Sequence, residues 1–327
     1  MATASEQLAQ FAAGSKALGR LCREYKNRSA TVHLEELVGG ALSFYAAAAV
    51  AKTGGVHIFV AEDRDAAAYL LNDFYNLLDE KQVYFFPSSY KRSAAYGAED
   101  AQGVVQRTTA MNAVRGFTKG YLVVCTYPEA LAERVVDAAT LQRDTIAVKL
   151  GDKISIAVLE DALADANFTR VDFVYEPGQY SVRGGIVDVF SYSESKPYRI
   201  DFFGDEVDSI RRFNISSQLC ADKLDRAEIV PNLNAGEAPR VSFVQFAGSS
   251  ATCWFYDADY VLRRVNDLRR KVLADMAEPG QIDRLLTSRN VLLRDMAGNS
   301  VVALRDNLPE RPATAAVVFD TAPQPKF

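Results

Sequence analysis

Apolar residues in the first third of the chain fall into short continuous runs that are separated by stretches with helical spacing. The runs 56–62, 81–87 and 121–127 have the length and the apolar content of buried strands. Apolar residues at helical spacing over 70–78 predict one helix after Asp63, and a second is expected over about 102–114. Strands that alternate with helices predict a mostly parallel sheet with helices on both faces.

In the middle of the chain, apolar residues recur at every second position. In 197–213, Tyr198, Ile200 and Phe202 alternate on one face before Gly204-Asp205, which is turn chemistry, so this segment predicts a hairpin. The preceding residues 148–174 predict a strand, a turn at Gly151-Asp152, a short helix and a further strand over 171–174. Residues 88–100 have no clear period and are expected to form an exposed loop.

The α/β pattern returns after about residue 214. Residues 240–246 and 251–257 continue it, a helical segment follows over 259–276, and a last strand-like run precedes a Pro-rich tail. Asp257 and Asp259 stand where the strand meets the helix. An Asp in that place accepts hydrogen bonds from free amides of the first turn, so we interpret the pair as a helix cap and not as a metal site.

The segment 175–190 places Arg183 beside Gly184-Gly185, between two strand-like runs. A Gly pair inside a strand indicates a bulge or the close approach of another backbone, and a bulge turns the neighbouring side chain outward. An outward Arg offers a planar fork of five donors to a carboxylate of a partner. The alternative is a plain hairpin with a solvated Arg.

Bulk composition narrows the function classes. The chain has 327 residues, a net charge of −5 and a pI near 5.3, which argues against a broad nucleic-acid footprint because phosphate binding needs clustered positive charge. No apolar run reaches membrane-spanning length and the N-terminus lacks a signal pattern, so we expect a cytoplasmic protein without a membrane partner.

Cysteines and histidines give no support to a catalytic or metal site. The four Cys are far apart in sequence and are interpreted as reduced core thiols: Cys22, Cys125, Cys220 and Cys253. Neither His33 nor His57 has a Ser, Cys or carboxylate cluster beside it, so no catalytic triad and no His-rich metal site is expected.

The segment 33–50 is the candidate for a phosphate-binding loop. When the phosphate-loop pattern is laid over 36–43, Gly39 matches the middle Gly, with Gly40 beside it, and Ser43 keeps its chemistry. Leu42 stands where the pattern requires Lys, which removes the formal positive charge that opposes the phosphates. The sequence therefore predicts a degenerate phosphate loop that binds no nucleotide.

The Arg-Gly strand and the hairpin that follows it resemble the bacterial transcription-repair coupling factors (Mfd) and the excision-repair subunit UvrB. The match is long and ungapped over Tyr180, Arg183, Gly184 and the hairpin 197–213. In lacking this Lys, the chain is similar to the coupling factors, whose phosphate loop at this place is degenerate. UvrB keeps a functional phosphate loop. The resemblance thus favours the N-terminal UvrB-homology region of a coupling factor.

The resemblance implies the fold and its division. The expected fold is α/β, a helicase-like, P-loop-type parallel sheet domain with an inserted smaller α+β domain. Residues 1–135 are expected to form the first part of the sheet domain, 136–214 the insertion, 215–316 the return segment that completes the sheet, and 317–327 a linker to absent modules.

The resemblance also implies partners. UvrA is expected to bind at Arg183, Arg170, Gly184 and Val187, and the C-terminal module of the same protein is expected to mask that surface. RNA polymerase, DNA, ATP and magnesium belong to absent modules, so this chain itself is expected to need no cofactor and to carry no catalytic residue. Two alternatives stay open, a nucleotide-binding enzyme that depends on Ser43 and a helicase-like module that binds DNA.

Overall fold

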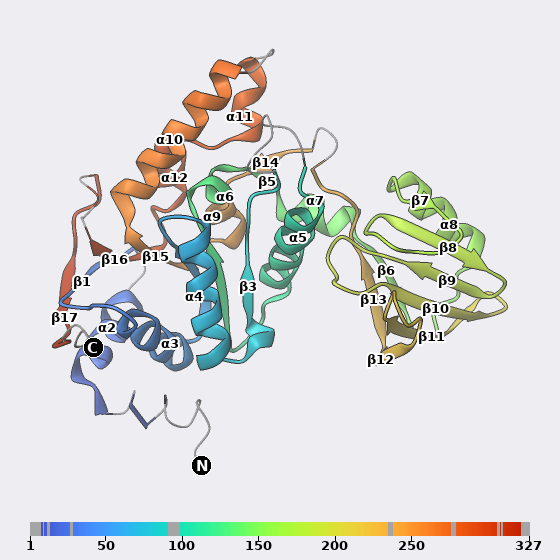
Figure 1. Cartoon of the computed structure of the whole chain (residues 1–327), viewed down its shortest axis with the longest axis horizontal. Helices are drawn as coiled ribbons and strands as arrows, with labels where there is room; N and C mark the ends of the chain where they lie inside the picture. Colours follow the sequence, from blue (N-terminus) through green and yellow to red (C-terminus); the bar gives the residue numbers. More distant parts are fainter. Residues whose placement is uncertain are drawn as a thin grey trace.

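The computed structural model describes residues 8, 10–11, 14–26, 29–90, 99–234, 238–275, 279–305, 308 and 310–321. These residues form a large unit around a parallel sheet and a smaller unit that projects from it on one side (Figure 1). The expected α/β fold with an inserted smaller domain is confirmed.

Within the described residues, the large sheet has seven strands in the order β17-β1-β16-β15-β2-β4-β3, and every pair in it is parallel. Its strands are β1 (Thr31–Glu35), β2 (Gly55–Val60), β3 (Val83–Phe85), β4 (Tyr121–Thr126), β15 (Thr252–Asp257), β16 (Ser300–Arg305) and β17 (Ala315–Val318). The return segment supplies β15 and β16, which lie between β1 and β2. The chain thus leaves the sheet, builds the small unit, and returns to the middle of the same sheet.

Helices cover both faces of this sheet because successive strand residues point to opposite sides. Phe59 packs on one side with α2 (Lys16–Lys26) and α3 (Ala41–Thr53). Ile58 and Val60 pack on the other side with residues of α5 (Ala101–Gly116), α6 (Pro128–Ala132), α10 (Ala258–Asp275) and α12 (Arg289–Asp295).

Helix α4 (Arg64–Leu77) packs on the same side as Phe59, with Phe74 buried against it. The remaining helices of the large unit are short: η1 (Glu80–Gln82), α7 (Ala138–Asp144), α9 (Phe243–Ala247), η2 (Pro279–Gln281) and α11 (Ile282–Leu285). Helix α4 begins after Asp63, whose carboxylate accepts a hydrogen bond from the Ala66 amide at 2.8 Å. A small pairing of β5 (Val135–Val136) with β14 (Arg240–Val241) precedes α9, so residues 240–246 form a short strand and a helix. Of the loop expected over 88–100, residues 91–98 lie outside the described part.

The smaller unit is a mixed sheet packed against one helix, α8 (Ile156–Asp165). Its strand order is β12-β11-β10-β9-β8-β7, and a separate antiparallel pair, β6 with β13, lies beside it. The strands are β6 (Ile146–Lys149), β7 (Thr169–Arg170), β8 (Gln179–Arg183), β9 (Ile186–Val189), β10 (Tyr198–Phe203), β11 (Glu206–Phe213), β12 (Cys220–Leu224) and β13 (Arg226–Ile229). Leu159 and Leu163 of α8 are buried in one core with Val187 and Ile200.

Three boundaries differ from the sequence expectation. The strand expected over 171–174 is wrong, because β7 ends at Arg170 and the next residues leave the ladder. Strands β12 and β13 lie beyond residue 214, yet β12 pairs with β11 and β13 with β6 of the small unit. Strand β17 reaches Val318 and pairs with β1, beyond the expected sheet end at residue 316.

Gly184 and Gly185 form the turn of a hairpin and not a bulge. Arg183 pairs with Ile186 across it, and Gly184 has φ +60°, a conformation that favours glycine. The close backbone approach is real, since the Phe202 amide donates to the Gly185 carbonyl at 2.8 Å. The register irregularity lies instead in β10, between Asp201 and Phe202. The hairpin at Gly204-Asp205 is confirmed, because β10 and β11 pair on either side of it.

Candidate functional site

Arg183 ends β8 directly before the glycine turn, and its side chain is 37% exposed. Its Nη2 donates to Asp188 Oδ2 at 2.6 Å, and its guanidinium lies 4.8 Å from the centre of the Phe173 ring. An arginine held by one hydrogen bond and one ring is partly oriented before any partner arrives. It is neither a freely solvated side chain nor a fully neutralised one.

Asp188 accepts hydrogen bonds from two arginines. Its side chain is 2% exposed and also accepts hydrogen bonds from Arg199, from Nε at 2.7 Å and from Nη2 at 2.8 Å. The hydrogen bond to Asp188 raises the pKa of Arg199, so this guanidinium stays charged. One buried carboxylate between two guanidiniums leaves the group with a net positive charge, and the more exposed of the two arginines is Arg183.

The basic residues of the small sheet gather on the face that carries Arg183. Asp188 faces Arg199, Arg199 faces Arg211, and Arg211 faces Lys223 across neighbouring strands. Arg212 points the other way and pairs with Glu194 at 2.9 Å. Alternation along β11 thus sends Arg211 and Arg212 to opposite faces, and Arg211 shares the face of Arg183.

Arg170 lies in the edge strand β7, beside β8 and on the side of the small unit that is remote from the large sheet (Figure 1). Its side chain is 62% exposed and pairs with Glu160 at 3.1 Å. Arg170 is in register with Tyr180, so its side chain lies on the α8 side of the sheet, opposite to the face that carries Arg183. Phe173 and Tyr175, which follow β7, are 49% and 61% exposed, and Phe173 lies under Arg183. An exposed aromatic residue beside an arginine is typical of a protein-binding surface.

Two further residues were expected at this surface. Gly184 is exposed in the hairpin turn. Val187 is fully buried in the core of the small unit, so it cannot touch a partner directly. Sequence reasoning missed Phe173 because residues 171–174 were expected to form a strand, and it also missed Tyr175, which directly follows them.

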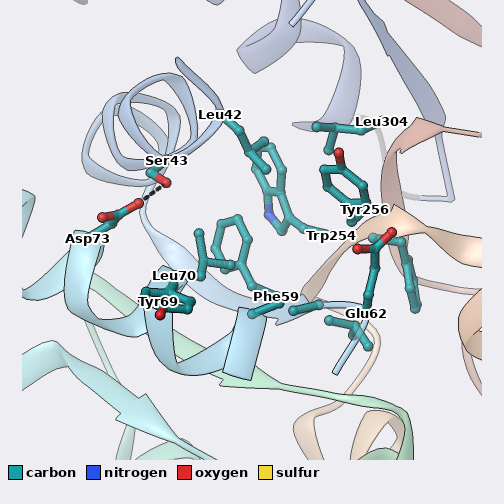
Figure 2. Close-up of a pocket in the computed structure, with 14 residues that line it drawn as sticks. Leu42, Ser43, Phe59, Glu62, Tyr69, Leu70, Asp73, Trp254, Tyr256 and Leu304 are labelled. Atoms are coloured by element: carbon teal, nitrogen blue, oxygen red, sulfur yellow. Dashed lines mark hydrogen bonds between the residues drawn. The ribbon is translucent and has the colours of Figure 1, made fainter. Parts of the chain in front are cut away.

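The candidate phosphate loop connects β1 to α3, the place where such a loop belongs in this kind of sheet. Gly39 has φ +60°, and a side-chain carbon at Gly39 or Gly40 would meet open space. The Ser43 hydroxyl donates to Asp73 Oδ2 at 2.5 Å, and Leu42 lines an apolar pocket (Figure 2). The Asp73 carboxylate, hydrogen-bonded to the hydroxyl that a phosphate loop would use, opposes phosphate binding.

The helix-cap interpretation is confirmed for Asp257, at the end of β15, but not for Asp259. Asp257 accepts a hydrogen bond from the Tyr260 amide at 2.8 Å, and Asp259 pairs with Arg263 and with Arg289, each at 2.9 Å. No group of three or more potential metal ligands exists among the residues that the structure describes. In the same described ranges, no helix is both long and apolar enough to cross a membrane.

The four cysteines and His57 differ in their burial. Cys22, Cys125 and Cys253 are buried, as expected, but Cys220 is exposed at the edge strand β12 and is not a core thiol. His57 is buried and lowered in pKa to about 4 by desolvation. Its Nδ1 accepts from the Trp254 indole at 3.1 Å, and its Nε2 lies 3.0 Å from the Gly54 carbonyl.

Comparison with known proteins finds a family model that matches the small unit. Residues 146–234 match the UvrB interaction domain family. The chain is 27% identical over 199 residues to the transcription-repair-coupling factors of Bacillus subtilis (strain 168) and of Escherichia coli (strain K12), which covers 61% of this chain and 17% of each relative. It is 35% identical over 101 residues to that of Haemophilus influenzae, covering 31% of this chain and 9% of the relative.

These matches confirm the resemblance to coupling factors that the Arg-Gly strand and the hairpin predicted, and they are consistent with the N-terminal region of that family. The aligned part spans less than a fifth of the length of these relatives.

Proposed function

We propose that this chain is an adaptor that recruits the nucleotide excision repair machinery by binding UvrA. The contact is made by the Arg183 surface, which we define as Phe173, Arg183 and Gly184, and Arg170 on the neighbouring edge strand β7 extends it. The observation that carries the proposal is that the matched UvrB interaction domain, 146–234, encloses the unit on which Arg183 is exposed above Phe173.

The chemistry of this surface fits a protein partner that offers a carboxylate. Within the described residues only Nη2 of Arg183 forms a hydrogen bond, which leaves Nε and Nη1 for a bidentate contact. Phe173 covers one face of the guanidinium and adds apolar area beside it. The interleaved acids Asp188 and Asp201 limit the positive charge of the face, which suits protein recognition better than tracking of a phosphate backbone.

The proposal extends to the longer protein in which such a region occurs. There the adaptor brings excision repair to RNA polymerase stalled at a DNA lesion, while modules outside this chain contact polymerase and DNA and hydrolyse ATP with magnesium. The chain itself is catalytically silent, which the Leu42 substitution and the Ser43–Asp73 hydrogen bond support. The C-terminal module of the same protein covers the Arg183 surface until activation, which is a population shift between masked and open states.

The test is the affinity of UvrA for this chain and for two Arg→Ala variants, measured by calorimetry. Arg183→Ala is expected to lose about 2–4 kcal/mol of binding free energy, the usual cost of removing an anchor arginine. Arg226→Ala is the matched control, because Arg226 lies in the same unit on the separate β6-β13 pair and is 45% exposed. Equal affinity of both variants, or binding of UvrB in place of UvrA, would contradict the proposal.

A further inference from the structure

A pocket of about 290 Å³ opens at the carboxyl ends of β2 and β15, between the first turn of α3 and helix α4 (Figure 2). This volume is at the small end of the range for pockets that hold small molecules, about 300–1,000 Å³. The crevice beyond the carboxyl ends of parallel strands is also where sheets of this kind bind ligands. The position of the pocket thus favours ligand binding, although the Lys of a phosphate loop is missing.

The walls of the pocket are aromatic. Phe59 and Trp254 stack with ring centres 5.0 Å apart, and Tyr256 continues the same strand. Tyr69 of α4 also lines the pocket and is 76% exposed, so its ring is available to a ligand. A planar ring would find apolar faces on several sides here, and ring contacts add to the burial of area.

The charged side chains that line the pocket are both acidic. Glu62 forms no ion pair or hydrogen bond within the described part of the chain, and Asp73 accepts the Ser43 hydroxyl. Arg305 stacks on Tyr256 at 4.8 Å but is not among the lining residues. The amino end of α3 adds only about half a positive charge, which two full carboxylates outweigh.

From these walls and charges, we propose that the pocket is a binding site for a small aromatic compound that carries a positive charge, such as an aromatic amine. Its ring lies against Trp254 and its ammonium group faces the Glu62 carboxylate, while Asp73 lies on the opposite side of the pocket (Figure 2). Phosphorylated compounds are repelled by the same two carboxylates. The pocket lies on β2 and β15 of the large sheet, away from the small unit that carries Arg183 (Figure 1). The proposed ligand site is therefore independent of the proposed UvrA binding.

The test uses two probes of the same shape and opposite charge, 2-phenylethylamine and 3-phenylpropionate. Trp254 is the single Trp of the sequence and lines the pocket, so its fluorescence reports occupancy directly. We expect saturable binding of the amine, with a Kd of about 0.1–10 mM for a ligand of this size. The propionate is expected to bind at least about tenfold more weakly, because its charge is repelled.

Variants separate the pocket from non-specific binding. Glu62→Gln is expected to weaken binding of the amine by about three- to tenfold and Asp73→Asn by less, because Asp73 lies on the opposite side of the pocket; both variants are expected to bind the propionate equally or more tightly. Ala66→Leu fills the pocket and is expected to abolish binding of both probes, with Leu304→Phe as a second filling variant if the first unfolds. Asp161→Asn, an exposed carboxylate on α8, is the control and is expected to change nothing.

Three results overturn the proposal. One is the lack of a saturable amine signal in the folded wild-type chain. Another is equal amine binding by the wild type and by the Glu62, Asp73 and filling variants, since the fluorescence change then arises elsewhere. The third is binding of the propionate or of magnesium ATP as tight as that of the amine, because an anion is then accepted.

Discussion

At the scale of single residues, Asp188 is the side chain on which the Arg183 surface depends. It is buried and holds both Arg183 and Arg199 by hydrogen bonds of 2.6–2.8 Å. Breaking a buried charge pair leaves uncompensated charge, and here it leaves two guanidiniums facing each other. Asp188 therefore belongs to the stability of the small unit as well as to its binding surface.

We expect Asp188→Ala to lower the free energy of unfolding by about 3 kcal/mol, the low end of the cost of breaking a buried ion pair. Urea unfolding followed by circular dichroism measures this. Asp201→Ala is the comparison, because Asp201 pairs with Arg211 on the same face but is more exposed, so a smaller loss is expected. Equal losses from both variants contradict the role given to the burial of Asp188.

His57 gives the molecule a defined acid sensitivity. Its pKa in the folded chain is about 4 against an ordinary 6.5, because burial disfavours the charged ring. The unfolded chain therefore binds the proton more readily between these two pH values. The stabilisation is complete above about pH 6.5, falls as the pH drops towards 4, and changes no further below that.

The size of this loss is about 3 kcal/mol between pH 7 and pH 4. His57→Gln is the variant that isolates it, since an amide can still accept the Trp254 indole hydrogen and donate to Gly54. The difference in unfolding free energy between wild type and His57→Gln, measured by urea titration across this range, should follow the curve of a single group. A difference that stays constant with pH rules His57 out as the acid-sensitive group.

At the scale of elements, the turn at Gly184-Gly185 sets how β8 and β9 pair and therefore where Arg183 lies. Gly184 has φ +60°, and a two-residue turn of this kind prefers Gly, Asn or Asp. We expect Gly184→Val to destabilise the small unit by about 1–2 kcal/mol, since a β-branched residue fits this backbone poorly. Gly184→Asn should stay within about 1 kcal/mol of wild type. Thermal unfolding distinguishes them, and equal effects contradict the turn as the cause.

The sequence predicted best those elements whose pattern of apolar residues is compatible with only one kind of structure. The runs at 56–62 and 121–127 became β2 and β4, and the hairpin over 197–213 formed as expected. The pair Gly184-Gly185 was ambiguous, because period-two residues flank a bulge and a turn alike. The segment 171–174 misled because its apolar letters suit a strand, while Phe173 in fact lies exposed under Arg183.

The sites depend on contacts that are distant in sequence, which explains what stayed hidden. The aromatic pocket joins Leu42, Phe59, Trp254 and Leu304, which no spacing rule brings together. The burial of Val187 follows from the register of β9 against β10 and not from its neighbours in the chain. Leu42 at the Lys position, in contrast, is a local feature that was predictable.

At the scale of the whole molecule, the small unit leaves and rejoins the large one through a pair of adjacent strands. β6 and β13 run antiparallel, with Ile146 paired to Ile229, so both ends of the insertion lie together. The unit has its own buried core around Leu159, Val187 and Ile200. Its polar contacts with the large unit include the Arg115–Glu228 ion pair at 2.9 Å and the hydrogen bond from the Thr109 hydroxyl to the Ser193 carbonyl at 2.9 Å, and Val230 and Leu233 at its end are buried in the core of the large unit.

A unit with adjacent ends and a separate core should fold alone. We expect the excised residues 146–234 to unfold cooperatively and to bind UvrA within about threefold of the full chain, because the Arg183 surface lies entirely in this unit. Near-ultraviolet circular dichroism and calorimetry test the two statements separately. A folded fragment that does not bind places part of the docking surface on the large unit, whereas an unfolded fragment shows that the β6-β13 pair needs the large sheet for its stability.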